Sequence, residues 1–159
     1  MNRIRLRPVC AEDAEAITLL LEGDVELALQ TSSILIPFTI ESARRFLSAA
    51  DPQRTYAILA DDELVGVTGP VRAAEPPEIG YWIGRPHRKK GYATAAVGLL
   101  LEEMKARGIS QFAAEVFPGN TASMRVLGKN GFVRDGEVQR DLPMRGGLRR
   151  LLRFQLAVS

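Results

Sequence analysis

Apolar residues recur along the chain at two different spacings, and each spacing predicts one type of element. The clearest helical stretch follows Gly91, where apolar side chains three or four positions apart fall on one face of a helix. These side chains are Ala93, Ala96, Val97, Leu100, Leu101 and Met104. Lys105 and Arg107 stand in the expected last turn and Gly108 follows, which is typical of a helix C-terminus. The pattern therefore predicts an amphipathic helix directly behind a glycine.

Three other segments show helical signals. Glu12 and Asp13 stand in the first turn of a predicted helix whose apolar positions continue to Leu21. Further helices are predicted from Ile40 to Ala49 and from about Thr121 to Lys129. The intervening residues 23–39 show no clear period, so we expect loops around a site there.

Short runs of β-branched and aromatic residues, bounded by proline, glycine and aspartate, predict strands. The predicted strands are an opening one around Ile4 to Leu6, then Thr55–Leu59, Leu64–Thr68, Glu78–Gly84, Ser110–Phe117, Phe132–Val138 and Leu148–Val158. Gly69-Pro70 is expected to end the third strand. Most neighbours form hairpins, and one strand–helix–strand unit lies in the middle. The fold class is therefore α+β, or mixed α/β, and not a doubly wound sheet.

The bulk composition limits the class of protein further. The chain has 159 residues, 46% hydrophobic and 25% charged, with no repeat or linker, so we expect one domain over residues 1–159. The formal net charge of +2 gives no argument for nucleic-acid binding. The single cysteine, Cys10, excludes an internal disulfide framework and most simply occupies a small, at least half-buried site. No signal-like or membrane-spanning run is evident, so the expected location is the cytoplasm.

The stretch HRKKGYATAA, from His87 to Ala96, places cationic side chains directly before the glycine that opens the predicted helix. The first amides of a helix lack partners and carry positive potential, and a glycine lets an anion approach the backbone closely. The arrangement predicts a diphosphate site. The GxxxxGK[ST] and GxGxxG motifs are absent, which argues against P-loop nucleotide hydrolysis and dinucleotide binding.

A second motif, NTASMRVLGKNGF, runs from Asn120 to Phe132. Asn120 is a good helix N-cap, and Ser123 and Leu127 share its face of the helix. The run Arg88-Lys89-Lys90-Gly91-Tyr92-Ala93 and this second motif resemble, in order and interval, the acyl-CoA loop and the following helix of the GNAT N-acetyltransferase superfamily. Together with EIGYWIG, they look most like the branch that contains ribosomal-protein alanine and serine N-terminal acetyltransferases. The resemblance covers essentially the whole chain.

The resemblance implies a GNAT-like acyl-CoA N-acyltransferase fold, with about four helices flanking a mostly antiparallel twisted sheet of about seven strands. It implies acetyl-CoA as cosubstrate without a metal, and a pantetheine arm that runs beside Tyr81–Gly84 where two central strands separate. A backbone amide near Trp82 or Ile83 is expected to hold the reaction's oxyanion. The cofactor-binding residues implied in this way are Trp82, Ile83, Gly84, Arg88, Lys89, Lys90, Gly91, Tyr92, Ala93, Thr94, Asn120 and Ser123.

Acetyl transfer to an amine needs an unprotonated nucleophile, so a base is required at neutral pH. Glu78 resembles in position the base of histone-type members, and Glu115 that of one ribosomal-protein type. Both stay open as candidates, and for each the alternative is an exposed strand carboxylate. Many relatives protonate the leaving thiolate with a tyrosine on the short helix, but the matching position here is Leu127. Ser123 is the remaining candidate for a catalytic hydroxyl, and the thiolate can also leave unassisted.

The amine acceptor is not identified by the sequence. A protein N-terminal amine, such as that of a ribosomal protein, and a small amine, such as a polyamine or an antibiotic, are both open. We expect residues 23–39 and the turn from Pro143 to Gly147 to line its entrance. A protein that binds acyl-CoA without turnover, as a sensor or scaffold, is the alternative class.

A basic series near the C-terminus raises RNA binding as a further alternative. Its alternation with leucine places these arginines on the wet face of a strand instead. The series is Arg134, Arg140, Arg145, Arg149, Arg150 and Arg153. We therefore expect no nucleic-acid or membrane partner, and a monomer or a homodimer.

Overall fold

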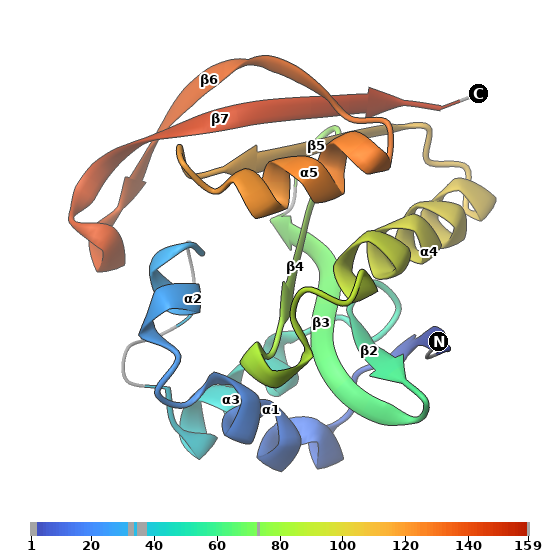
Figure 1. Cartoon of the computed structure of the whole chain (residues 1–159), viewed down its shortest axis with the longest axis vertical. Coiled ribbons are helices and arrows are strands. Elements are labelled where there is room, and N and C mark those ends of the chain that lie inside the picture. The colour runs from blue at the N-terminus through green and yellow to red at the C-terminus, as the bar shows by residue number, and fades with distance from the viewer. Residues whose placement is uncertain (1–2, 32–33, 35–37, 73, 159) are drawn as a thin grey trace.

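The computed structural model describes residues 3–31, 34, 38–72 and 74–158. These residues form one seven-stranded sheet in the order β1-β2-β3-β4-β5-β7-β6 (Figure 1). The strands are β1 Ile4–Pro8, β2 Tyr56–Ala60, β3 Glu63–Arg72, β4 Glu78–Ile83, β5 Gln111–Val116, β6 Val133–Leu142 and β7 Gly147–Ala157. Neighbouring strands are antiparallel except β4 and β5, which are parallel. The predicted mixed class is confirmed.

Five α-helices are found in the described part of the chain. They are α1 Ala14–Leu21, α2 Val25–Leu29, α3 Ile40–Ala49, α4 Tyr92–Ala106 and α5 Thr121–Lys129. Short 3-10 turns precede α1, precede α4 and join β6 to β7: η1 Ala11–Asp13, η2 Arg85–His87 and η3 Pro143–Arg145. In Figure 1, α4 and α5 lie next to each other, whereas α1 and α3 pack together at the end of the molecule away from β6 and β7. No described helix has both the length and the apolar character needed to cross a bilayer.

The predicted helices agree closely with the observed ones, with one addition among the helices and one difference in a strand. A fifth helix, α2, lies within residues 23–39, whose positions 32, 33 and 35–37 fall outside the described residues. The prediction that Gly69-Pro70 ends the third strand is wrong, because β3 continues to Arg72 with Pro70 opposite Ile79. The register shifts between Pro70 and Arg72, and such an irregularity accommodates a proline inside a sheet.

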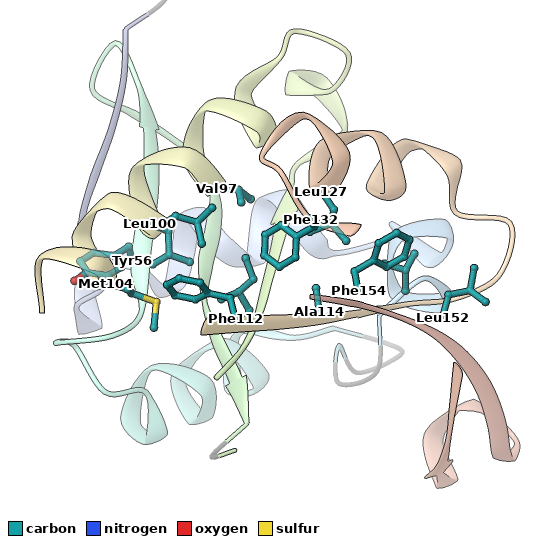
Figure 2. Close-up of a cluster of buried hydrophobic side chains, with 13 residues drawn as sticks. Tyr56, Val97, Leu100, Met104, Phe112, Ala114, Leu127, Phe132, Leu152 and Phe154 are labelled. Atoms are coloured by element: carbon teal, nitrogen blue, oxygen red, sulfur yellow. The ribbon is translucent and has the colours of Figure 1, made fainter. Parts of the chain in front are cut away.

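The largest core cluster lies between the sheet and the two helices α4 and α5 (Figure 2). Val97 and Leu100 of α4 are fully buried there, together with Phe112 of β5. Leu127 of α5 and Phe132 close the same cluster. Burying one such side chain stabilises a fold by about 1.5–3 kcal/mol. This packing fixes where the N-termini of α4 and α5 meet the sheet.

The parallel contact between β4 and β5 is short. Within these two described strands, the paired residues are Glu78 and Ala113, and the amide of Ala113 donates to the Pro77 carbonyl at 2.9 Å. The antiparallel pairs on either side continue along their strands, from Gly66↔Ile83 to Arg72↔Glu78 in the case of β3 and β4. The sheet therefore separates along β4 after its first residue, as the resemblance implies.

Candidate active site

A cavity of about 1190 Å³ lies along the separation of β4 and β5. One part is lined by the segment from Arg88 to Thr94, by β4 and by the N-terminus of α5. Another part is lined by α1, α2 and α3, including Leu27 and Phe46. The volume exceeds the roughly 300–1,000 Å³ that is usual for one small-molecule ligand. The cavity therefore has room for two reactants that approach from different ends.

The loop before α4 has the backbone geometry of an anion cradle. Lys89 and Gly91 both adopt the left-handed conformation, with φ of 64° and 81°. Left-handed residues of this kind occur in anion-binding backbone turns, and the first amides of α4 lack partners within the helix. A Cβ built on Gly91 would meet no protein atom within 4 Å, so the space beside this glycine is open. The loop thus combines open backbone space with neighbouring cations, which is the arrangement that a diphosphate site requires.

The side chain of Arg88 serves a different purpose from its neighbours in this loop. Its Nε donates to the Ile83 carbonyl at 2.9 Å, and its guanidinium forms an ion pair with Asp24. Arg85 also contacts Asp24, at 3.1 Å. Asp24 is the N-cap of α2, and its Oδ1 accepts from the Leu27 amide at 3.2 Å. The cofactor loop is therefore tied by charge to the helix that lines the other end of the cavity.

Burial alone would raise the pKa of Asp24. The hydrogen bond from the Leu27 amide and the guanidinium of Arg88 outweigh burial and lower the pKa of this carboxyl. Asp24 is therefore a fixed negative charge at neutral pH.

Arg145 of η3 holds the other end of α2. It is buried, and its guanidinium donates to the carbonyls of Ala28 at 3.0 Å and Thr31 at 2.9 Å, and also to that of Ile34. These are carbonyls at and beyond the C-terminus of α2, where helices leave acceptors unsatisfied. The turn from Pro143 to Gly147 thus supports the wall of the cavity and is not part of its lining, which corrects the prediction.

Both candidate bases line the cavity and lie on one face of the sheet. Glu78 is paired with Ala113, and Glu115 follows two positions later on the strand, so their side chains point to the same side. Trp82, two pairs of residues further along β4, faces the cluster under α1 and α3. Glu78 is 5% exposed and the Glu115 side chain 1% exposed. The alternative that either is an exposed strand carboxylate is wrong.

Glu115 is held by two arginines. Arg140 Nε donates to its Oε1 at 2.9 Å and Arg140 Nη2 to its Oε2 at 2.5 Å, while Arg153 approaches Oε2 at 3.5 Å. The hydrogen bond with Glu115 raises the pKa of Arg140, and desolvation opposes it. The carboxylate of Glu115 thus neutralises part of the charge of two partly buried arginines.

The other arginines of the basic series are also engaged. Arg134 and Arg150 contact Glu137, and the Arg149 guanidinium lies 5.1 Å from the centre of the Phe117 ring. With Arg145 buried, the prediction that the series forms one wet strand face is wrong. Four of its six members pair with a carboxylate, which weakens the case for an RNA surface.

The remaining catalytic candidate, Ser123, lies at the N-terminus of α5. Asn120 caps this helix by accepting from the Ser123 amide at 3.2 Å. The hydroxyl of Tyr81 on β4 donates to Ser123 Oγ at 3.1 Å. Burial raises the pKa of Tyr81, and the hydrogen bond with Ser123 opposes that shift. The side chains of Tyr81 and Ile79 pack toward α4 and α5, on the opposite face of the sheet from Trp82.

The structure gathers most of the predicted cofactor residues at the cavity. All of them line it except Gly84 and Lys90. A Cβ on Gly84 would meet Leu20 Cδ2 at 2.5 Å, so this glycine serves close packing with α1, and Lys90 is exposed. Cys10 is exposed, which corrects the expectation of a buried or half-buried site.

Sequence reasoning missed the partners that organise the cavity. Asp24 before Val25 is a recognisable N-cap signal for α2, but its arginine partners are 61 and 64 residues away. Arg145 is 117 residues from Ala28, and Tyr81 is 42 residues from Ser123. No pattern within a short stretch of sequence predicts such contacts.

Three features occur together at the cavity: strands that separate, a loop with open backbone amides, and two buried carboxylates. This combination is typical of an acyl-CoA transferase. The model of the "Acetyltransferase (GNAT) domain" matches residues 3–133. The chain therefore belongs to the GNAT acetyltransferase family, and it is an N-acetyltransferase that uses acetyl-CoA.

Known proteins resemble the chain over most of its length. The probable N-acetyltransferase YjcK of Bacillus subtilis (strain 168) is 29% identical over 161 aligned positions, covering 90% of this chain and 87% of that protein. RimJ of Mycobacterium smegmatis in complex with CoA-disulfide is 26% identical with a TM-score of 0.83, covering 97% and 81%. The ribosomal L7/L12 α-N-protein acetyltransferase RimL in complex with coenzyme A has the same fold, with a TM-score of 0.86 at 18% identity over 98% and 94%.

Proposed function

We propose that this enzyme acetylates the N-terminal amine of a protein, with Glu78 as the base. The observation that carries the acceptor class is the second end of the cavity, which is lined by α1, α2 and α3 and leads to the buried Glu78. Its walls are mainly apolar, with Leu27, Phe38 and Phe46 among them. Such walls suit the side chains of an extended peptide better than they suit a polycationic amine or an aminoglycoside.

The likeness to RimL supports the same acceptor class. RimL is an α-N-protein acetyltransferase of a ribosomal protein, and its fold matches this chain along nearly its whole length. A ribosomal protein is therefore the first acceptor to test. The proposed place of action is the cytoplasm, which the single cysteine of the chain supports.

In the proposed mechanism Glu78 takes the proton of the attacking amine, directly or through one water. An α-amino group has a pKa near 7.7–8.0, so a fraction of it is already neutral at pH 7. The base has to deprotonate only the remaining fraction. The nitrogen then attacks the thioester carbonyl, a backbone amide near Trp82 or Ile83 holds the oxyanion, and the sulfur leaves as thiolate.

Glu78 is favoured over Glu115 because of what holds the latter. Each Glu115 oxygen accepts from Arg140, and protonating Glu115 would break this ion pair and leave the arginine without its counter-charge. We therefore assign to Glu115 the task of holding Arg140 and Arg153 in place behind the cavity wall.

The acceptor class is tested by measuring coenzyme A released from acetyl-CoA in the presence of three groups of amines. These are peptides with a free N-terminal serine or alanine, polyamines, and aminoglycosides. We expect turnover with the peptides and none with the same peptides carrying an N-acetyl cap. Turnover with small amines alone would refute the protein acceptor while leaving acetyl transfer intact.

The base is tested with two matched substitutions. Glu78→Gln should lower kcat by about 10²–10⁴ at neutral pH, with partial recovery at high pH where the amine loses its proton unaided. Glu115→Gln should affect kcat less and thermal stability more. The opposite pattern would make Glu115 the base.

A further inference from the structure

Position 127 holds no hydroxyl, although the family resemblance expects a tyrosine there. Leu127 is 2% exposed and belongs to the core cluster under α4 and α5. A leucine offers the leaving sulfur no hydrogen-bond donor. The cavity wall nevertheless carries two hydroxyls in contact, those of Tyr81 and Ser123, 3.1 Å apart.

We propose that Tyr81 is a positioning residue that turns the Ser123 hydroxyl toward the leaving sulfur of the thioester. The inference rests on the acetyl transfer proposed above: Ser123 takes over the task of the absent α5 tyrosine, and a residue of β4 holds it in position.

The direction of the hydrogen bonds supports this assignment. Tyr81 is the donor to Ser123 Oγ, and the Ser123 amide is taken by Asn120 Oδ1. Among the described residues, no group accepts a hydrogen bond from the Ser123 hydroxyl. Ser123 thus has one lone pair engaged by the tyrosine and one hydrogen available to an acceptor in the cavity that it lines.

Tyr81 is suited to hold this arrangement in place. Its ring packs against the core cluster of α4, α5 and β5, and it belongs to the strand along which the sheet separates. Burial raises the pKa of Tyr81, so the phenol keeps its proton at neutral pH and remains a donor. A donor to Ser123 Oγ polarises the serine O–H and strengthens it as a donor in turn.

The chemical step balances without ionising either hydroxyl. When the tetrahedral intermediate collapses, the C–S bond breaks and its electron pair stays on sulfur. The Ser123 O–H stabilises this thiolate by a charge-assisted hydrogen bond. The amine proton goes to Glu78, and the thiolate takes its proton from water after release.

The test measures the pKa of the thiol of coenzyme A bound to the purified enzyme, from the ultraviolet absorbance of the thiolate as pH is raised. Desulfo-coenzyme A bound to the same protein gives the baseline and removes the contribution of Cys10. A charge-assisted hydrogen bond should lower the pKa of the bound thiol by about one unit relative to free coenzyme A titrated in the same way. Tyr81→Phe and Ser123→Ala should each abolish most of this shift, and the double variant should add nothing further.

Tyr56→Phe is the matched control. It also removes a buried tyrosine hydroxyl, but that hydroxyl bonds to the Gln53 carbonyl and to Arg107 and does not line the cavity. The bound thiol should titrate as in the wild type. In turnover, Tyr81→Phe should lower kcat about tenfold and leave the KM for acetyl-CoA within about twofold, because the hydroxyl acts on the leaving group and not on binding.

The outcomes separate this inference from the proposed function. Normal coenzyme A binding with an unshifted thiol, or a shift that survives Tyr81→Phe, would overturn the inference alone. Failure of the wild-type protein to bind coenzyme A would overturn acetyl transfer and this inference together.

Discussion

Gly91 offers the sharpest test of the cofactor cradle, because a second glycine with nearly the same φ stands at the other end of α4. Gly91 precedes the helix with φ of 81°, and Gly108 follows it with φ of 88°. A Cβ would meet no protein atom within 4 Å at either position. Alanine at either site therefore introduces the same backbone strain and no steric clash with the protein.

The magnitude follows from that strain. A left-handed L-residue costs roughly 1–2 kcal/mol relative to glycine, so both substitutions should lower the free energy of unfolding by about that amount. For a domain of this size each kcal/mol shifts Tm by about 2–4 °C. For Gly108→Ala, this loss of stability should be the whole effect. In Gly91→Ala the new methyl group also occupies the space assigned to the diphosphate.

Calorimetric titration with coenzyme A separates the two effects. Gly91→Ala should weaken binding by at least about tenfold, equivalent to one lost charge-assisted hydrogen bond, whereas Gly108→Ala should bind as the wild type does. Equal losses of affinity in the two variants, or no loss in Gly91→Ala, would show that the diphosphate does not rest on this loop.

Three further substitutions test the supports of the site. Glu115→Gln should lower the free energy of unfolding by about 1–3 kcal/mol in thermal denaturation, because two partly buried arginines lose their counter-charge. Glu137 forms exposed ion pairs, so the control Glu137→Gln should change the free energy of unfolding by less than about 1 kcal/mol. Asp24→Asn keeps an oxygen to cap α2 but removes the charge. Because the pKa of Asp24 is lowered in the fold, its charge adds to the free energy of unfolding above about pH 4, and this contribution is lost as pH falls through the lowered pKa. In urea unfolding, the stabilities of the variant and the wild type should therefore differ at pH 7 and converge in strong acid. Gly66→Ala should severely destabilise the sheet, because its Cβ would stand 2.1 Å from a backbone oxygen of β4. Gly128 lies in α5 with open space beside it, so Gly128→Ala should stabilise the protein by about 0.5–1 kcal/mol. Comparable Tm values for the two variants would contradict this packing.

Most of the helices and strands are indicated by residues within the element or next to it in the sequence. The bounds of α3 and α5 are set by caps next to them in the chain, Thr39 and Asn120, and the end of α4 by Gly108. Such signals lie within a few residues of what they control, so one sequence is enough to find them.

The contacts that build the active site depend on residues far apart in sequence. Five residues of α2 are too few to form a stable helix alone, and it is kept in place by distant arginines at both ends. Pro70 remains in a strand because the pairing of β3 with β4 becomes irregular there. The contact of Tyr81 with Ser123 likewise exists only once β4 and α5 have been brought together by the core.

The anchoring of α2 has a consequence for how the enzyme's range of amines can change. Arg145 grips backbone carbonyls, and Asp24 acts from the residue before the first turn, so neither anchor depends on which side chains the helix presents to the cavity. Glu26, Leu27 and Gln30 line the cavity and can therefore be exchanged with both anchors kept. Libraries confined to these three positions are the shortest route to variants that accept new amines without loss of the scaffold.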